Sequence, residues 1–148
     1  MKLTFATIIS AFVCISGCAI TPWPHTANAT PHVRGSIEDA GKPLPNALVR
    51  VATGTNEDPC AGKAVEATTG SDGVFEVEPV KELQLFLVMM AHAFIPWNLC
   101  YKDDGEWVLL TSVEEYALVD TGPVGVQVVR CDLRSTTNNR CEITWKED

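Results

Sequence analysis

Apolar and polar side chains alternate with a period of two through most of the chain after residue 31. Val33, Gly35 and Ile37 alternate with Arg34, Ser36 and Glu38, and similar alternation or apolar runs recur over residues 47–52, 65–69, 74–80, 97–102, 107–111, 124–133 and 141–146. Successive side chains of a strand point to opposite faces, so this period predicts half-buried strands. About seven to nine short strands separated by turn residues predict an all-β protein with an antiparallel β-sandwich.

Two segments depart from the alternation. Residues 82–90 are nearly all apolar, which predicts a central strand covered on both faces. Ser112, followed by Glu115, fits a capping box for a short helix through Leu118, although a strand fits these residues nearly as well.

Aspartate–glycine pairs predict the positions of two hairpin turns, because these residues accept the positive φ of tight turns. Ser71-Asp72-Gly73 would join the strands 65–69 and 74–80. Asp103-Asp104-Gly105 would join 97–102 and 107–111.

The N-terminus has the pattern of an export signal. Lys2 precedes an apolar run from Leu3 to Val13, which is too short to span a bilayer. Ile15-Ser16-Gly17-Cys18 then resembles the lipobox of bacterial lipoproteins, in which the cysteine becomes the acylated first residue. The resemblance implies a signal peptide over 1–17 and a lipid anchor in the bilayer at Cys18; the alternative is an ordinary cleavable signal with Cys18 incidental.

The residues after the anchor predict a spacer and a destination. Residues 18–31 contain three prolines among small polar residues, which favours a stiff, extended tether before a domain over 32–148. Ala19 and Ile20 follow the cysteine without an aspartate. The lipoprotein sorting rule then implies placement in the cell envelope, at the outer membrane.

Composition limits the domain count and the partners. Without its first 17 residues the chain of 148 would retain 131, enough for one domain, and losing Lys2 would move the net charge from −8 to −9. An acidic surface argues against a nucleic-acid partner, because phosphates attract a basic one. It would suit a basic protein partner, although acidity also simply favours solubility.

Four cysteines of the domain predict two disulfides in an oxidising compartment. A turn near Thr136 would place Cys131 opposite Cys141, close enough to bridge, which leaves Cys60 for Cys100. The cysteine spacing and the scattered histidines do not fit a zinc site, so no metal and no cofactor are expected.

Three stretches of the first half resemble the carboxypeptidase regulatory-like family. They are residues 33–39 (VRGSIED), 41–51 (GKPLPNALVRV) and 69–75 (TGSDGVF) with Pro79-Val80, and the last stretch contains Asp72-Gly73 and Phe75. The resemblance covers about fifty residues and implies a prealbumin-like (transthyretin-like) sandwich. It also implies an accessory role, because few members of the family have chemistry of their own.

Catalytic signatures are weak in this sequence. His32 and His92 lie in the domain without a recognisable nucleophile motif, and the pairs Asp103/Asp104 and Glu114/Glu115 fit turn and surface charges better than acid–base groups. Asn56-Glu57-Asp58 lacks the spacing of a calcium loop. We therefore predict no catalytic residue and a non-enzymatic protein; an enzyme of unknown type is the least favoured alternative.

One segment is a candidate binding loop. Residues 89–97 (MMAHAFIPW) combine large apolar side chains with a proline, which favours a loop over a strand. If exposed, it would form a recognition surface; the alternative is that it closes one end of the sandwich. The candidate contact residues are Met89, Met90, His92, Phe94, Ile95 and Trp97.

Taken together, these features predict a membrane-anchored lipoprotein whose sandwich binds another envelope protein. The alternative is an immunity or inhibitor lipoprotein that neutralises a toxin or hydrolase, for which an acidic surface would suit a basic target.

Overall fold

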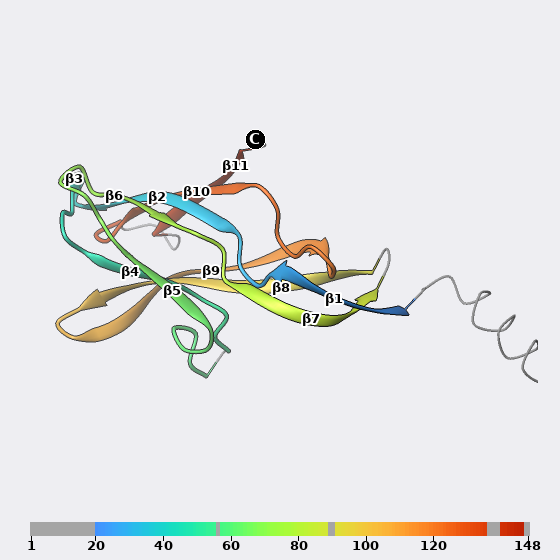
Figure 1. The fold of residues 1–148 in the computed structure, drawn as a ribbon. Helices are drawn as coiled ribbons and strands as arrows, with labels where there is room; N and C mark the ends of the chain where they lie inside the picture. The colour runs from blue at the N-terminus through green and yellow to red at the C-terminus, as the bar shows by residue number, and fades with distance from the viewer. Residues whose placement is uncertain (1–19, 56, 89–90, 136–139, 147–148) are drawn as a thin grey trace, which may run out of the picture.

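A computed structural model of the chain describes residues 20–55, 57–88, 91–135 and 140–146, and all regular structure in these ranges is β. The predicted all-β sandwich is confirmed (Figure 1). The strands are β1 (Ile20–Asn28), β2 (His32–Asp39), β3 (Lys42–Pro43), β4 (Leu48–Ala52), β5 (Ala64–Thr68), β6 (Val74–Val77), β7 (Lys81–Val88), β8 (His92–Asp103), β9 (Glu106–Leu118), β10 (Val126–Asp132) and β11 (Cys141–Lys146). In the described part of the chain, no helix could cross a membrane.

Two sheets form the layers of the sandwich. One has the order β11-β10-β2-β3, with β6 also paired to β2, and the other has the order β5-β4-β8-β9. Figure 1 shows the two layers one above the other. The pairing is antiparallel except between β10 and β2, which run parallel. The antiparallel β-sandwich is as predicted, and this one parallel pair joins strands far apart in sequence.

The core lies between the inward faces of the two sheets. Each sheet contributes every second residue of its strands, as the period of two predicts. The members are Val33, Ile37, Phe75, Val77, Val129 and Cys131 from one layer, and Val49, Val51, Trp97, Leu99, Tyr101 and Leu110 from the other. Burying one such aliphatic side chain contributes roughly 1.5–3 kcal/mol.

Gly35 is required by the close approach of neighbouring atoms. A Cβ at this position would lie 2.5 Å from the carbonyl oxygen of Val129 and 2.7 Å from Cζ of Phe75. Gly35 pairs directly with Phe75 on β6 and with Val129 on β10. The absent side chain therefore makes room for the phenylalanine ring in the core.

Strands β1 and β7 form a separate two-stranded ribbon at one end of the molecule (Figure 1). Two predictions are wrong here. Residues 20–28, predicted as part of a stiff, extended tether, instead pair with residues 81–88. Residues 82–88 are not a central strand covered on both faces, because Leu83 and Leu85 are exposed. The period of two in β7 was hidden because both of its faces carry apolar side chains.

Hydrogen bonds hold the ribbon to the segment after β9. The side-chain amide of Gln84 donates to the carbonyl of Val119, and the Val88 amide donates to the Asp120 carboxylate. The Asn28 amide donates to the Thr121 carbonyl. The folded unit therefore begins at least as early as β1, rather than at residue 32.

The two predicted turns have different outcomes. Asp104 and Gly105, both with positive φ, join β8 and β9 as a hairpin, as predicted. Gly73 also has positive φ, but its turn carries the chain from β5 in one sheet to β6 in the other. Aspartate–glycine specifies a reversal, and the partner of each strand is decided by packing. Residues 112–118 are strand, so the helix alternative is wrong.

Candidate functional site

Residues 92–97 of the segment predicted as a binding loop are the beginning of strand β8, so the loop prediction is wrong for these residues. Their side chains divide between the two faces. Trp97 is fully buried and Ile95 half-buried in the sandwich, whereas His92 and Phe94 are exposed on the outer face. Met89 and Met90 lie outside the described residues. The segment thus fills the core with one set of side chains and presents the other set to solvent.

Pairing of β8 with β9 brings aromatic rings together on this outer face. Phe94 pairs with Tyr116 and His92 with Leu118. The His92 and Tyr116 rings stack with centroids 5.0 Å apart, and the Phe94 ring lies 5.2 Å from Tyr116 at a tilt of 54°. Phe94 and Tyr116 remain 67% and 62% exposed. Such exposed aromatic clusters are typical of interfaces.

A hollow of about 280 Å³ borders this cluster where the edges of the two sheets meet. It is lined by His92, Tyr116 and Leu118 from the β8–β9 pair and by Val124 and Trp145, which are both mostly exposed. Strand β9 ends one sheet and β11, which carries Trp145, ends the other. We call this surface the β9 edge site: His92, Phe94, Tyr116, Leu118, Val124 and Trp145.

A buried carboxyl group lies on the inner side of the β9 edge site. Glu115 lines the same hollow and is only 5% exposed. Burial raises the pKa of Glu115 to about 7, and a hydrogen bond from Gln127 Nε2, 3.4 Å from Glu115 Oε2, opposes the shift. Gln127 is fully buried, and its Oε1 atom has no hydrogen-bond partner among the described residues. The site therefore combines an apolar rim with a polar floor that changes charge near neutral pH.

The expectation that Glu115 is a surface charge is wrong. Glu114 is exposed as expected, but strand alternation turns Glu115 inward with Val113 and Ala117. The period of two contained the signal, because Val113, Glu115 and Ala117 share one face of any strand through these residues. This signal was not decisive at the sequence level, because a capped helix was an alternative for the same residues.

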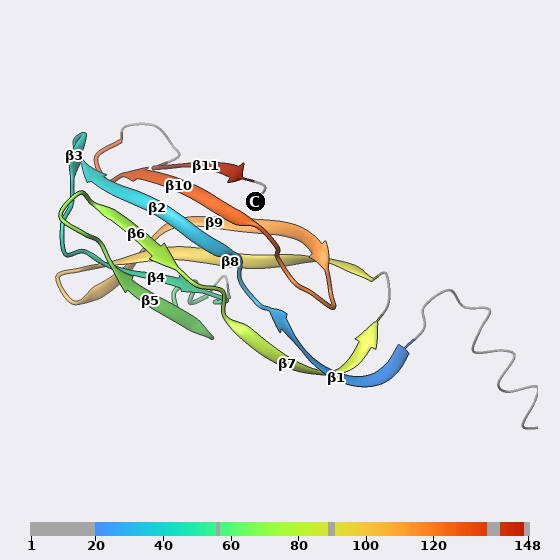
Figure 2. The same cartoon turned by 45° about the horizontal axis from the view of Figure 1, so that its top comes forward.

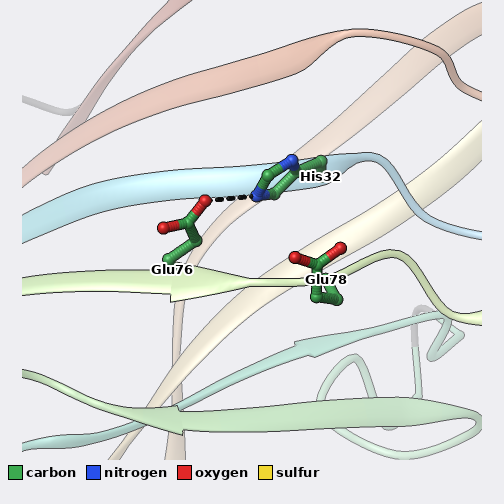
Figure 3. Close-up of side chains that lie close together, drawn as sticks. All are labelled: His32, Glu76 and Glu78. Carbon is green, nitrogen blue, oxygen red and sulfur yellow. Dashed lines mark hydrogen bonds and ion pairs between the residues drawn. The ribbon is translucent and has the colours of Figure 1, made fainter.

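His32, Glu76 and Glu78 form a second cluster on the outer face of the other sheet (Figure 3). His32 Nε2 lies 2.8 Å from Glu76 Oε1, and the Arg34 guanidinium lies 2.7 Å from the same oxygen. The hydrogen bond from Arg34 lowers the pKa of Glu76, with a smaller contribution from His32. One potential ligand atom from each of the three residues lies within 4.8 Å of the others, but a cation there would have to displace an ion pair that already satisfies Glu76.

Both predicted disulfides are present. Cys131 and Cys141 are directly opposed in the β10–β11 pair, with Cα atoms 4.1 Å apart. Cys60 and Cys100 join the loop after β4 to strand β8, with Cα atoms 6.0 Å apart. Cys18 lies outside the described residues, so acylation at that position stays a prediction.

Comparison with known proteins gives no family. No family model matches the sequence, and no curated protein matches it. Among solved structures, chlorocatechol 1,2-dioxygenase from Pseudomonas putida is 14% identical with a TM-score of 0.37, over 69% of this chain and 58% of that one. (S)-Allantoin synthase is 10% identical with a TM-score of 0.34, over 83% and 46%. The chain spans about half the length of these two proteins, and likenesses this distant carry no functional argument.

Proposed function

We propose that this protein is a lipid-anchored envelope protein that binds another envelope protein through the β9 edge site. Its role is binding rather than catalysis. Cys18 would carry the anchor, and the absence of an aspartate after Cys18 would direct the protein to the outer membrane. The carboxypeptidase regulatory-like resemblance agrees with an accessory role.

The observation that carries the proposal is the concentration of exposed rings and aliphatic groups around one hollow. Phe94, Tyr116, Val124 and Trp145 are each more than half exposed, although each would stabilise the protein if it were buried. Aromatic side chains lose little conformational entropy on binding and often dominate the energy of an interface. Tyr116 and Trp145 also lie on β9 and β11, which end the two sheets in the described part of the chain, and an end strand offers unpaired backbone groups to an extended partner segment.

A photoactivatable crosslinker placed at Phe94 or at Trp145 tests this proposal in intact cells. We expect both positions to crosslink to the same envelope protein. Leu109 is the matched control, because it is an exposed leucine of β9 near the opposite end of the strand. Failure of both positions, or the same product from Leu109, would refute the β9 edge site as the contact surface.

Affinity capture from solubilised envelopes provides an independent measurement. Phe94→Gln and Trp145→Gln should each lower the amount of partner that is captured at least tenfold, whereas Leu109→Gln should leave that amount unchanged. Trp97, although part of the predicted segment, is unsuitable as a probe because it is buried in the core. Incorporation of labelled palmitate into the native protein, and its loss in Cys18→Ser, tests the anchor separately.

A further inference from the structure

The β1–β7 ribbon carries no charged residue over most of its length and exposes several large apolar side chains. From Ile20 to Asn28 and from Leu83 to Val88 it contains no aspartate, glutamate, lysine or arginine, in a chain with a net charge of −8. More than half of the surface of its largest apolar side chains is exposed: Trp23, Leu83, Leu85 and Phe86. The ribbon therefore leaves a large apolar surface uncovered within the described part of the chain.

Covalent geometry places this ribbon next to the expected lipid anchor. Ile20 is only two residues after Cys18, so their Cα atoms can be no more than about 7 Å apart. Ile20 begins β1 and pairs with Val88, at the opposite end of the ribbon from the Asn28–Lys81 pair (Figure 2). Because residues 20–28 are folded into the ribbon, no flexible spacer from this segment separates the anchor from the domain.

The charged groups of the ribbon lie at its other end. Lys81 pairs with Asn28, and Glu82 forms an ion pair of 2.6 Å with Lys63. Acidic side chains are repelled by anionic lipid headgroups, so a strand pair with no charged residue of its own at this end can approach a bilayer with less repulsion than the acidic remainder of the protein. The Asp120 carboxylate contacts this end, where it accepts a hydrogen bond of 2.7 Å from the Val88 amide. Tryptophan beside aliphatic side chains is the composition that membrane proteins place at the headgroup level.

We propose that the β1–β7 ribbon is a membrane-contacting surface. In the acylated protein, Trp23, Leu83, Leu85 and Phe86 enter the headgroup region of the lipid layer that holds the acyl chains. This inference rests on acylation at Cys18 from the proposed function. The ribbon would fix the orientation of the sandwich on the membrane and hold the β9 edge site at a set distance from it.

Quenching of tryptophan fluorescence by brominated lipid tests the contact. The full-length mature protein is reconstituted into vesicles of phosphatidylethanolamine and phosphatidylglycerol, with and without bromine on the acyl chains. We expect the brominated lipid to quench the tryptophan fluorescence of the native protein. The quenching should fall at least threefold in Trp23→Phe and should be retained in Trp107→Phe. Both variants keep an aromatic ring, so both should fold, and the disulfides can be verified by non-reducing mass analysis.

A double variant tests the neighbouring leucines. Leu83→Gln with Leu85→Gln should reduce the quenching of Trp23 at least twofold, because the ribbon loses its apolar contact with the lipid. Leu109→Gln, on an exposed position of β9 away from the ribbon, should leave the quenching unchanged. Equal quenching in the double variant and the native protein would overturn the proposal.

The possible failures can be distinguished. Acylated protein whose quenching is the same in Trp23→Phe would overturn the ribbon contact and leave the lipoprotein function standing. Protein whose intact mass shows no acyl chain would refute the anchor and the ribbon proposal with it. A dimer of the Cys18→Ser protein that Leu85→Gln dissociates would show that a second copy, rather than lipid, covers the ribbon.

Discussion

Replacing Glu115 by glutamine should change how the stability of the sandwich depends on pH. Glutamine has the shape of a protonated glutamate, so it keeps the packing of the site and removes only the ionisation. Its amide group can also donate to Gln127 Oε1, which has no partner among the described residues. The variant thus separates the effect of charge from the effect of volume.

The direction of the effect follows from proton linkage. The pKa of Glu115 is raised from 4.5 to about 7 by burial, so between these values the folded protein holds a proton that the unfolded chain has released. Stability therefore falls as the pH rises through this range and becomes constant above the folded pKa. Glu76, whose pKa is lowered, changes stability only at pH values below about its ordinary value of 4.5.

The magnitude follows from the same pKa values. A shift from 4.5 to about 7 corresponds to about 3 kcal/mol, at roughly 1.36 kcal/mol for each pKa unit. The hollow beside Glu115 brings solvent near the carboxylate and screens part of this cost. We therefore expect the native protein to lose about 1–2 kcal/mol of stability between pH 5 and pH 8 through this group, and Glu115→Gln to lose none of it.

Urea unfolding at pH 5, 6, 7 and 8, followed by tryptophan fluorescence, measures the difference. The comparison uses Cys18→Ser protein with intact disulfides, so that no detergent is needed. Glu115→Gln should be within about 1 kcal/mol of the native protein at pH 5 and about 1–2 kcal/mol more stable at pH 8. Glu114→Gln is the matched control, because its carboxylate is exposed on the opposite face of β9.

The comparison cancels contributions from histidines and other groups common to both proteins. If the stabilities of the native protein and Glu115→Gln keep a constant difference from pH 5 to pH 8, the carboxyl does not titrate in this range. The buried position of Glu115 would then have to be reconsidered.

Two further predictions concern the framework. Replacing Cys131 and Cys141 by serine should lower the free energy of urea unfolding by about 2–3 kcal/mol. Replacing Cys60 and Cys100 should lower it by about 4 kcal/mol, because this disulfide closes the longer loop. The opposite order would contradict the loop-entropy explanation. Gly35→Ala should lower the unfolding free energy by about 1–3 kcal/mol, since its methyl carbon would lie 2.5 Å from the Val129 carbonyl oxygen, well inside van der Waals contact distance, so that the neighbouring strand must shift. An unchanged thermal midpoint would show that the sheet yields at this point.

The β9 edge site could be predicted only in part. The composition of residues 89–97 identified Phe94 and His92 as candidate contacts, and both are exposed. Tyr116, Val124 and Trp145 were not identified, because their proximity depends on the β8–β9 pairing and on the two sheet edges meeting. These residues are far from residues 89–97 in the sequence, so no local pattern indicates that they lie together.

The sequence by itself determined the strand character of the chain and the Cys131–Cys141 disulfide. Both are local properties: alternation with a period of two decides which side chains share a face, and a short turn places Cys131 opposite Cys141. The Cys60–Cys100 disulfide, whose cysteines are 40 residues apart, followed only because these two cysteines were left. Only the tertiary structure decided which strands are neighbours, because β10 joins β2 across most of the chain and β6 leaves the sheet of β5. It also decided that residues 20–28 are part of the fold and that Glu115 is buried, since burial depends on what packs against a face and strand periodicity defines only the face.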